Sequence, residues 1–161
     1  MQALIKILKH SNCVITTSKN SIKIKASGKP SPIKFLETNP YPHFATDLQS
    51  PFLALQTVSK GVSNIQENLY ETRFKIVPEL IKMGAVITVK DRTATVLGVD
   101  KLVGAKVSAP DLRSGAGLII AGLGAQGTTI ITDIENIERG YLNVDKDLQS
   151  LGADIKKITL T

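Results

Sequence analysis

The 161-residue sequence is poor in the residues that build disulfide frameworks, metal sites and aromatic binding surfaces. It contains one cysteine, Cys13, two histidines and no tryptophan, and aromatic residues make up only 4% of it. A single cysteine cannot form a disulfide within the chain, and two histidines provide no cluster with the spacing of metal ligands. We therefore expect no disulfide-stabilised fold, no metal site and no cofactor.

Long apolar runs are missing as well. No window approaches the roughly 20 uninterrupted apolar residues of a membrane span, and the start MQALIKILKHSN lacks the apolar stretch and cleavage site of a signal peptide. We expect a cytoplasmic protein without membrane contact. With 42% hydrophobic and 21% charged residues, the chain has the composition of a globular domain with a real core.

Acidic residues are outnumbered, since 14 of them stand against 20 lysines and arginines and leave a net charge of +6. Such an excess can indicate a nucleic-acid partner, but the lysines are scattered and aromatic residues for base stacking are few. We therefore do not expect nucleic acid as a partner. The charge favours an anionic small molecule instead.

What the sequence does contain is a unit that occurs three times. The segments LKHSNCVITTSKNSIKIK, LIKMGAVITVKDRTATVL and LQSLGADIKKITLT each join the end of a helix to an alternating strand. A residue suited to left-handed backbone follows each helix, and these residues are Asn12, Gly84 and Gly152. Cys13 occupies the place of two alanines, so we predict a small buried packing residue rather than a nucleophile.

The second and third copies extend upstream, where TDLQSPFLALQTVSKG corresponds to PDLRSGAGLIIAGLGAQG. The first extended unit is predicted to contain a strand at 32–38, a helix at 47–60, a strand at 63–68, a short helix opened by Pro78, and a hairpin of AVITV with TATVL. The second is predicted to contain a strand at 105–109, a helix at 111–124, a strand at 128–133, a helix ending near Leu151 and a strand at 153–158.

Each unit has the order βαβαββ, so the predicted fold class is α/β (α+β). The chain is expected to form a single incomplete domain, with the tail of one repeat at 1–30, a repeat at 31–98 and a repeat at 99–161. The first copy lacks its front half, and the third stops before its last strand. Uncovered apolar surface and strand edges make self-association of this incomplete domain an expectation.

Charged residues stand at the starts of the two long predicted helices. Asp47 and Asp111 can act as N-caps, each worth about 1 kcal/mol, or take part in chemistry. Arg113 lies in a first helical turn, at the positive end of the dipole, which makes sense where an anion also binds. Gly115 and Gly117 would let a ligand or another backbone approach closely. The alternative for Arg113 is a solvated surface pair with Asp111.

Local sequence favours a surface role for Arg139 in NIERGYLN. Glu135 and Glu138 lie close to it in sequence and can serve as ordinary surface partners.

The strings PHFATDLQ, ENLYETRFKIVPELIKMGA, APDLRSGAGLIIAGL and IERGY followed by LQSLGADI resemble, in this order, the bacterial UDP-N-acetylglucosamine 1-carboxyvinyltransferases. The resemblance covers nearly the whole chain and is strongest over 40–156. It implies transfer of enolpyruvate from phosphoenolpyruvate to the sugar 3-hydroxyl, the first committed step of peptidoglycan synthesis and thus of cell wall biogenesis, cell shape and cell division. It also implies an inside-out α/β prism: two domains of three βαβαββ units each, with the active site between them.

The resemblance assigns the sugar nucleotide to three positions. Asp47, in TDLQ, matches the aspartate that binds the 3-hydroxyl and is proposed as its general base. Leu69, in ENLYE, matches a position that contacts the UDP-sugar through its backbone. Arg73, in ETRF, matches a motif arginine near the cleft with a less defined role.

The resemblance assigns phosphoenolpyruvate to the positions of Arg113 and Arg139, which match arginines that hold this anion. Asp111 matches an acidic residue that helps to order the site. Two arginines and a helix start together suit a ligand that carries both a phosphate and a carboxylate. The resemblance therefore predicts a role in the site for Arg139, where local sequence alone favours a surface position.

Two departures from the family pattern bear on activity. The catalytic cysteine of the family, which is the target of fosfomycin, belongs to the domain that this chain lacks, and Cys13 does not match it. Ala45, in FATD, stands where the family usually has proline. We therefore expect the C-terminal portion of an enolpyruvyl transferase, inactive on its own. The alternatives are a shikimate-pathway enolpyruvyl transferase and a non-catalytic module of this fold that binds an anion or a partner.

Overall fold

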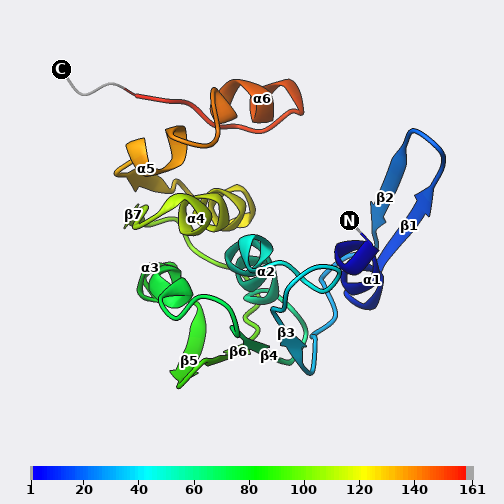
Figure 1. Cartoon of the computed structure of the whole chain (residues 1–161). Helices are drawn as coiled ribbons and strands as arrows, with labels where there is room; N and C mark the ends of the chain where they lie inside the picture. The colour runs from blue at the N-terminus through cyan, green and yellow to red at the C-terminus, as the bar shows by residue number, and fades with distance from the viewer. Residues whose placement is uncertain (1, 159–161) are drawn as a thin grey trace.

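The computed structural model describes residues 2–158 and begins with a helix and a projecting hairpin (Figure 1). Helix α1 spans Gln2–His10, strand β1 spans Cys13–Thr17 and strand β2 spans Ile22–Ala26. Asn12 joins α1 to β1 with a left-handed φ of 69°, as predicted for a helix end. The hairpin forms a separate two-stranded sheet and packs mainly on α1.

The middle part of the chain is a complete βαβαββ unit, which confirms the order read from the sequence. Its elements are β3 (Leu36–Glu37), the 3-10 helix η1 (Thr46–Leu48), α2 (Gln49–Gln56), β4 (Val62–Gln66), the 3-10 helix η2 (Arg73–Ile76), α3 (Val77–Lys82), β5 (Val86–Lys90) and β6 (Thr93–Leu97). The four strands form one sheet in the order β3-β4-β6-β5. Strands β3 and β4 are parallel, and the other pairs are antiparallel.

Local sequence explains the second half of this unit. Pro78 lies in the first turn of α3, where its missing N–H is no loss, and Gly84 ends the helix with a φ of 89°. In the hairpin, Ile87 pairs with Val96, and both side chains are buried on the face that points to the helices. The predicted pairing of AVITV with TATVL is confirmed.

The last part of the chain contains the front half of a further unit. Its elements are β7 (Lys106–Ser108), α4 (Leu112–Gly124), β8 (Ile130–Thr132), α5 (Glu135–Glu138) and α6 (Val144–Ser150). Strands β7 and β8 are parallel neighbours in a two-stranded sheet. The arrangement repeats that of β3 and β4 in the middle unit.

Three sequence predictions differ from the structure. Residues 153–158 form no strand, because the equivalent strand β5 is held by β6 and nothing in residues 2–158 takes that place here. The helix predicted at 47–60 ends at Gln56, where the Thr57 hydroxyl donates to the Ala54 carbonyl oxygen at 2.7 Å. The strand predicted at 32–38 is reduced to Leu36–Glu37.

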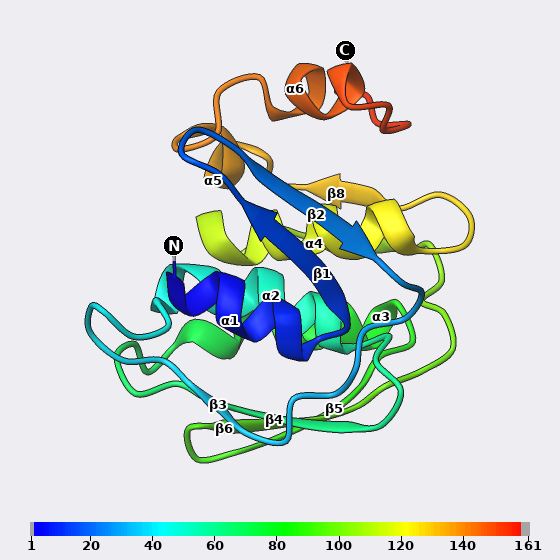
Figure 2. The same ribbon diagram turned by 90° about the vertical axis from the view of Figure 1, so that its right-hand side faces the viewer.

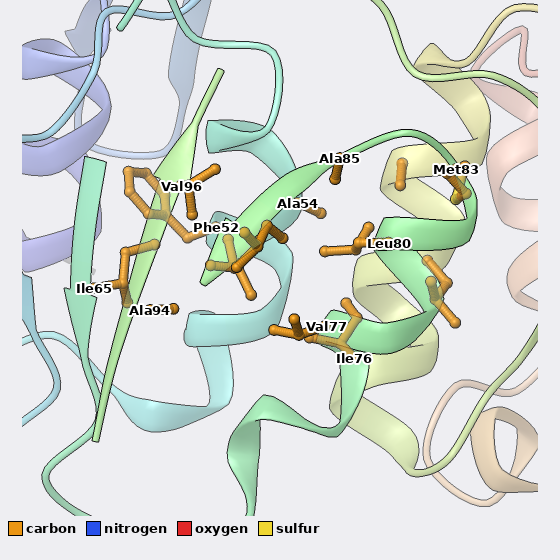
Figure 3. Packing of buried hydrophobic residues seen from close by; sticks show 14 of the residues in the cluster. Phe52, Ala54, Ile65, Ile76, Val77, Leu80, Met83, Ala85, Ala94 and Val96 are labelled. Atoms are coloured by element: carbon orange, nitrogen blue, oxygen red, sulfur yellow. The ribbon is translucent and has the colours of Figure 1, made fainter. Parts of the chain in front are cut away.

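The main core lies between the helices and the four-stranded sheet. Helices α2 and α3 cover one face of the sheet, and α4 packs on their other side (Figures 1 and 2). Figure 3 shows Ile65 and Val96 of the sheet pointing toward the helices, with Ile76 and Leu80 among the apolar side chains that they meet. This layering confirms the predicted α/β fold class.

Helix α4 approaches the other helices at glycines. A Cβ atom on Gly117 would lie 2.9 Å from the carbonyl oxygen of Ser50 in α2, and one on Gly115 would lie 2.4 Å from the Cγ1 atom of Ile137 in α5. From the sequence, these glycines were expected to admit either a ligand or another part of the protein. In the structure they allow close contact with other protein elements.

Cys13 is half-buried at the start of β1, whereas the equivalent Ala85 is buried. The predicted burial of the thiol is therefore only partial, because the hairpin has little besides α1 to pack against.

None of the helices in residues 2–158 is both long and apolar enough to cross a membrane. The same residues contain no group of three or more histidine, cysteine, aspartate or glutamate side chains placed to bind a metal ion.

Gly117→Ala is expected to destabilise the protein by up to about 2 kcal/mol. The new methyl group overpacks the contact with Ser50 at a cost of about 1–3 kcal/mol, and the gain in helix propensity of about 1 kcal/mol offsets only part of it. Urea unfolding gives the free energy of unfolding, and Gly124→Ala in the same helix is the control because a Cβ there meets nothing within 4 Å. Equal stabilities of the two variants would contradict the close approach of α4 to α2.

Candidate active site

Asp47 and Arg113 form an ion pair between two repeat units. The Arg113 Nε atom donates to Asp47 Oδ1 at 2.7 Å, although the residues lie 66 positions apart. Asp47 belongs to η1, just before α2, and Arg113 lies in the first turn of α4, so the close packing of the helices brings the two together. The hydrogen bond to Asp47 raises the pKa of Arg113 above its ordinary value. The sequence motifs identified both residues as candidate site residues, and the structure places them in direct contact.

Asp111 is the N-cap of α4, as predicted. Its Oδ1 atom accepts hydrogen bonds from the backbone N–H groups of Arg113 and Ser114, both at 2.9 Å, and Oδ2 accepts one from the Ser114 hydroxyl. The guanidinium of Arg113 bonds to Asp47 instead, so the alternative of a simple surface pair between Arg113 and Asp111 is wrong. Asp111 orients the helix start that carries Arg113.

Asp47 is not a helix cap, contrary to the local expectation. It lies inside η1, whose N-cap is Ala45, and its side chain accepts no capping bond. The carboxylate turns to Arg113 across the helix interface, a contact that local sequence does not reveal. Ala45 has a φ of −71°, which proline also adopts, so the backbone before Asp47 keeps the shape that the proline of the family pattern would give it.

Arg73 approaches the same carboxylate from a third direction. Its Nη2 atom lies 3.9 Å from Asp47 Oδ1, its Nε atom donates to the Thr46 hydroxyl at 3.1 Å, and the guanidinium stacks 4.5 Å above the ring centre of Tyr70. Burial, the stacked ring and these contacts hold the arginine in one place. Asp47 Oδ1 therefore faces two cations.

The second oxygen of Asp47, Oδ2, makes no hydrogen bond within the described residues. The Asp47 side chain is 60% exposed, so this oxygen is open to solvent. A carboxylate held through one oxygen and free at the other can accept a proton from a bound hydroxyl. Arg113 likewise uses only its Nε atom on the protein, and no bond to residues 2–158 engages its two terminal nitrogens. Together these groups offer a base beside an anion-binding fork.

A buried carboxylate, missed by the sequence analysis, supports these residues. Glu67 is 1% exposed, and its Oε1 atom accepts hydrogen bonds from the Thr38 hydroxyl at 2.7 Å and from the N–H groups of Leu69 and Tyr70 at 2.9 Å. Its Oε2 atom accepts one from the Thr46 hydroxyl at 2.9 Å. Glu67 thus fixes the backbone of Leu69 and, through Thr46, the segment that carries Asp47.

No local signal sets Glu67 apart in the sequence. Glu71 occurs four residues later in the same polar string, QENLYETR, and is exposed. Only the fold, which brings Thr38 and Thr46 to the end of β4, gives Glu67 its partners.

Arg139 is near the site but is not joined to it. The residue is exposed at the end of α5, and its side chain has no hydrogen bond or ion pair with residues 2–158. Neither expected surface partner engages it, and Glu138 pairs with Lys157 instead. The next residue, Gly140, abuts the first residue of α4, since a Cβ there would lie 2.7 Å from the Leu112 Cδ2 atom. Arg139 therefore directly precedes the residue that packs against the start of α4, the helix that carries Arg113.

Glu67→Gln is expected to lower the free energy of unfolding by about 1–3 kcal/mol. All four partners donate to the carboxylate, so an amide nitrogen in place of either oxygen would face a donor and leave it unpaired. Denaturant unfolding measures the effect. Glu71→Gln, in the same loop but exposed, should change stability by less than about 0.5 kcal/mol, and a loss as large as that of Glu67→Gln would contradict the assignment.

Known proteins of similar sequence share a name. The chain is 44% identical over 158 residues to UDP-N-acetylglucosamine 1-carboxyvinyltransferase 2 of Caldanaerobacter subterraneus, a match that covers 98% of the chain and 38% of that relative. It is 48% identical over 144 residues to UDP-N-acetylglucosamine 1-carboxyvinyltransferase 1 of Clostridium perfringens, covering 89% of the chain and 34% of that relative. The chain thus spans little more than a third of the length of these relatives.

Solved structures agree on the fold. The enolpyruvyl transferase NikO from Streptomyces tendae superposes with a TM-score of 0.85 at 26% identity, over 96% of this chain and 36% of that one. An EPSP synthase from Acinetobacter baumannii gives a TM-score of 0.70 at 20% identity, over 98% of this chain and 37% of that one, which is a likeness of fold alone.

The family model of EPSP synthase (3-phosphoshikimate 1-carboxyvinyltransferase) matches residues 1–148. This match covers most of the chain, and the named relatives confirm the resemblance seen in the motifs. The chain therefore belongs to the EPSP synthase family of carboxyvinyltransferases.

Proposed function

We propose that this chain is the C-terminal part of an enzyme that transfers enolpyruvate from phosphoenolpyruvate to the 3-hydroxyl of UDP-N-acetylglucosamine. The observation that carries the proposal is the carboxylate of Asp47, held at Oδ1 between Arg113 and Arg73 and open at Oδ2. The choice of substrates is supported by relatives that are 42–48% identical and named for this reaction.

Asp47 is the general base in this proposal. The sugar 3-hydroxyl donates its proton to Oδ2 as its oxygen attacks C2 of phosphoenolpyruvate, while the methylene carbon C3 gains a proton. The adduct then loses inorganic phosphate from C2 and a proton from C3, which restores the double bond of the transferred enolpyruvyl group. The adjacent arginines hold Asp47 in the orientation that this transfer requires. The acid that protonates the methylene carbon of phosphoenolpyruvate is assigned to no residue of this chain, and Cys13 is not that acid.

Phosphoenolpyruvate binds at the start of α4. The two terminal nitrogens of Arg113 form a fork that suits a carboxylate or phosphate, and the helix start adds a positive dipole end. Arg139, on the exposed segment next to Leu112, supplies the second cation. Asp111 keeps the first turn of α4 in place while these groups bind the anion.

The sugar nucleotide binds beside the loop that follows β4. Its contact is the backbone of Leu69, which Glu67 fixes through the N–H group, so the identity of this exposed side chain matters little. Arg73 stabilises this loop by stacking its guanidinium on the ring of Tyr70. In the complete protein, this chemistry belongs to peptidoglycan synthesis in the cytoplasm, and a further domain closes the site.

A second candidate acceptor is shikimate 3-phosphate, because the matching family model is described as 3-phosphoshikimate 1-carboxyvinyltransferase. Replacing UDP-N-acetylglucosamine by shikimate 3-phosphate in the assays below distinguishes the two. Turnover of shikimate 3-phosphate alone would overturn the proposed acceptor.

The isolated chain is expected to be inactive, because it spans about 38% of its relatives and contains no residue assigned as the acid. Phosphate release from phosphoenolpyruvate in the presence of UDP-N-acetylglucosamine measures this directly. Turnover comparable to that of a full-length relative would show that no further domain is needed for catalysis.

Asp47→Asn and Arg113→Ala are expected to lower kcat by about 10²–10⁴-fold when this chain replaces the matched segment of the Caldanaerobacter relative. We expect the loss of kcat to come from the catalytic step and not from unfolding, because the exposed Asp47–Arg113 pair contributes only about 0–1 kcal/mol to stability. Steady-state kinetics and thermal unfolding on the same samples separate the two effects. Asp91→Asn, in the exposed turn between β5 and β6, is the control with the same change of charge as Asp47→Asn. Normal rates in both site variants would refute the assignment.

A further inference from the structure

The Thr46 hydroxyl joins two buried charged side chains. Its Oγ1 atom lies 2.9 Å from Glu67 Oε2 and 3.1 Å from Arg73 Nε, and both of these residues are buried. An ionised carboxylate can only accept hydrogen bonds, and a guanidinium can only donate them. The single proton of the hydroxyl therefore points to Glu67, and a lone pair of its oxygen faces Arg73.

This lone pair fixes the place of the Arg73 guanidinium. The group is planar, so anchoring its Nε atom on Thr46 and its face on the Tyr70 ring, 4.5 Å away, leaves it little freedom. Its Nη2 atom then lies 3.9 Å from Asp47 Oδ1. Opposite charges attract at that distance, but it is longer than the roughly 2.7–3.2 Å of a hydrogen bond. Arg73 therefore leaves the lone pairs of Asp47 free.

Without the Thr46 hydroxyl, Arg73 would need another acceptor for its Nε–H group. The Arg73 side chain is only 8% exposed, so little water is at hand to replace the hydroxyl. The carboxylate of Asp47 lies close by, and its Oδ2 atom makes no hydrogen bond within residues 2–158. Arg113 already donates to Oδ1 at 2.7 Å. An unanchored Arg73 would therefore turn to Asp47 and occupy the oxygen that is now open.

The two oxygens of Glu67 serve different parts of the site. Its Oε1 atom bonds to the loop after β4, including the Leu69 N–H group at 2.9 Å, whereas Oε2 accepts the bond from Thr46. Loss of the Thr46 hydroxyl therefore leaves the contact that fixes the Leu69 backbone in place. Its effect falls on Arg73 and Asp47.

We propose that Thr46 is a positioning residue, whose hydroxyl holds Arg73 beside Asp47 without a hydrogen bond between them. Oδ2 of Asp47 thereby stays free to take the proton of the acceptor hydroxyl. This role of Thr46 rests on the proposed role of Asp47 as the general base and explains how that base remains available. Thr46 itself exchanges no proton with a substrate.

Thr46→Val and Thr46→Ser test this role when the chain replaces the matched segment of the Caldanaerobacter relative. Thr46→Val keeps the shape of the side chain without its hydroxyl and is expected to lower kcat by about 10–100-fold. KM for each substrate should change by less than about threefold, because Leu69 and Arg113 keep their contacts. Thr46→Ser retains the hydroxyl and should keep kcat within about threefold. Thr46→Ala, which also lacks the hydroxyl, replaces Thr46→Val if that variant does not fold.

Thr57→Val is the matched control for a purely structural effect. Thr57 is buried, and its hydroxyl donates to the Ala54 carbonyl oxygen at the other end of α2. Both valine variants lose one hydrogen bond and should unfold at a lower temperature, but only Thr46→Val should lower kcat.

A double substitution tests whether Thr46 acts through Arg73. Arg73→Met removes the guanidinium that would otherwise turn to Asp47. In that background Thr46→Val is expected to change kcat by less than about twofold, because the two substitutions affect the same contact. Steady-state kinetics on the four enzymes of this cycle measure the coupling.

Asp47→Asn in the same enzyme separates failure of this role from failure of the proposed function. A normal rate in Asp47→Asn would mean that Asp47 is not the base, and both proposals would be wrong. A large loss in Asp47→Asn with normal kcat in folded Thr46→Val would overturn the role of Thr46 alone. So would an equal loss of kcat in Thr57→Val, or a further loss when Thr46→Val is added to Arg73→Met.

Discussion

The candidate site depends on how closely α4 approaches α2. At Gly117 the backbone of α4 comes so near to the Ser50 carbonyl that a methyl group does not fit. This contact sets the two helix starts side by side, and only then does Arg113 reach Asp47 across 66 positions of sequence. The same α4 start carries the Asp111 cap, so one helix interface positions an acid, a cation and a set of oriented N–H groups.

The site separates the groups that hold its geometry from those that are free to react. Glu67 is buried and satisfied by four donors, so its loss would leave unpaired groups in the interior. Asp47 and Arg113 are partly exposed, and an ion pair in that setting adds little to stability. The stabilising polar contacts therefore lie beneath the surface groups, and the latter keep one oxygen and two nitrogens available for ligands.

Sequence patterns predicted the features that depend on neighbouring residues. The left-handed ends at Asn12, Gly84 and Gly152, the Pro78 helix start and the hairpin that follows are all confirmed, because each is encoded within a few residues. Features that depend on distant partners were missed. The alternating segment 153–158 forms no strand without a neighbour, and the contact of Asp47 with Arg113 and the buried position of Glu67 depend on partners that only the fold brings together.

Two surfaces of this chain are open, and the internal repeat explains why they are not equivalent. The Asp47 face is polar, so water can satisfy it until a ligand arrives, and its exposure costs little. Leu151 is 82% exposed beside a cleft of mixed polar and apolar lining, whereas its counterpart Met83 is fully buried in the middle unit. In the middle unit, strand β6 pairs with β4, and its Val96 contributes to the core that buries Met83. Leu151 is therefore exposed where its counterpart is buried, whereas the exposed carboxylate of Asp47 is a polar group that a ligand can reach.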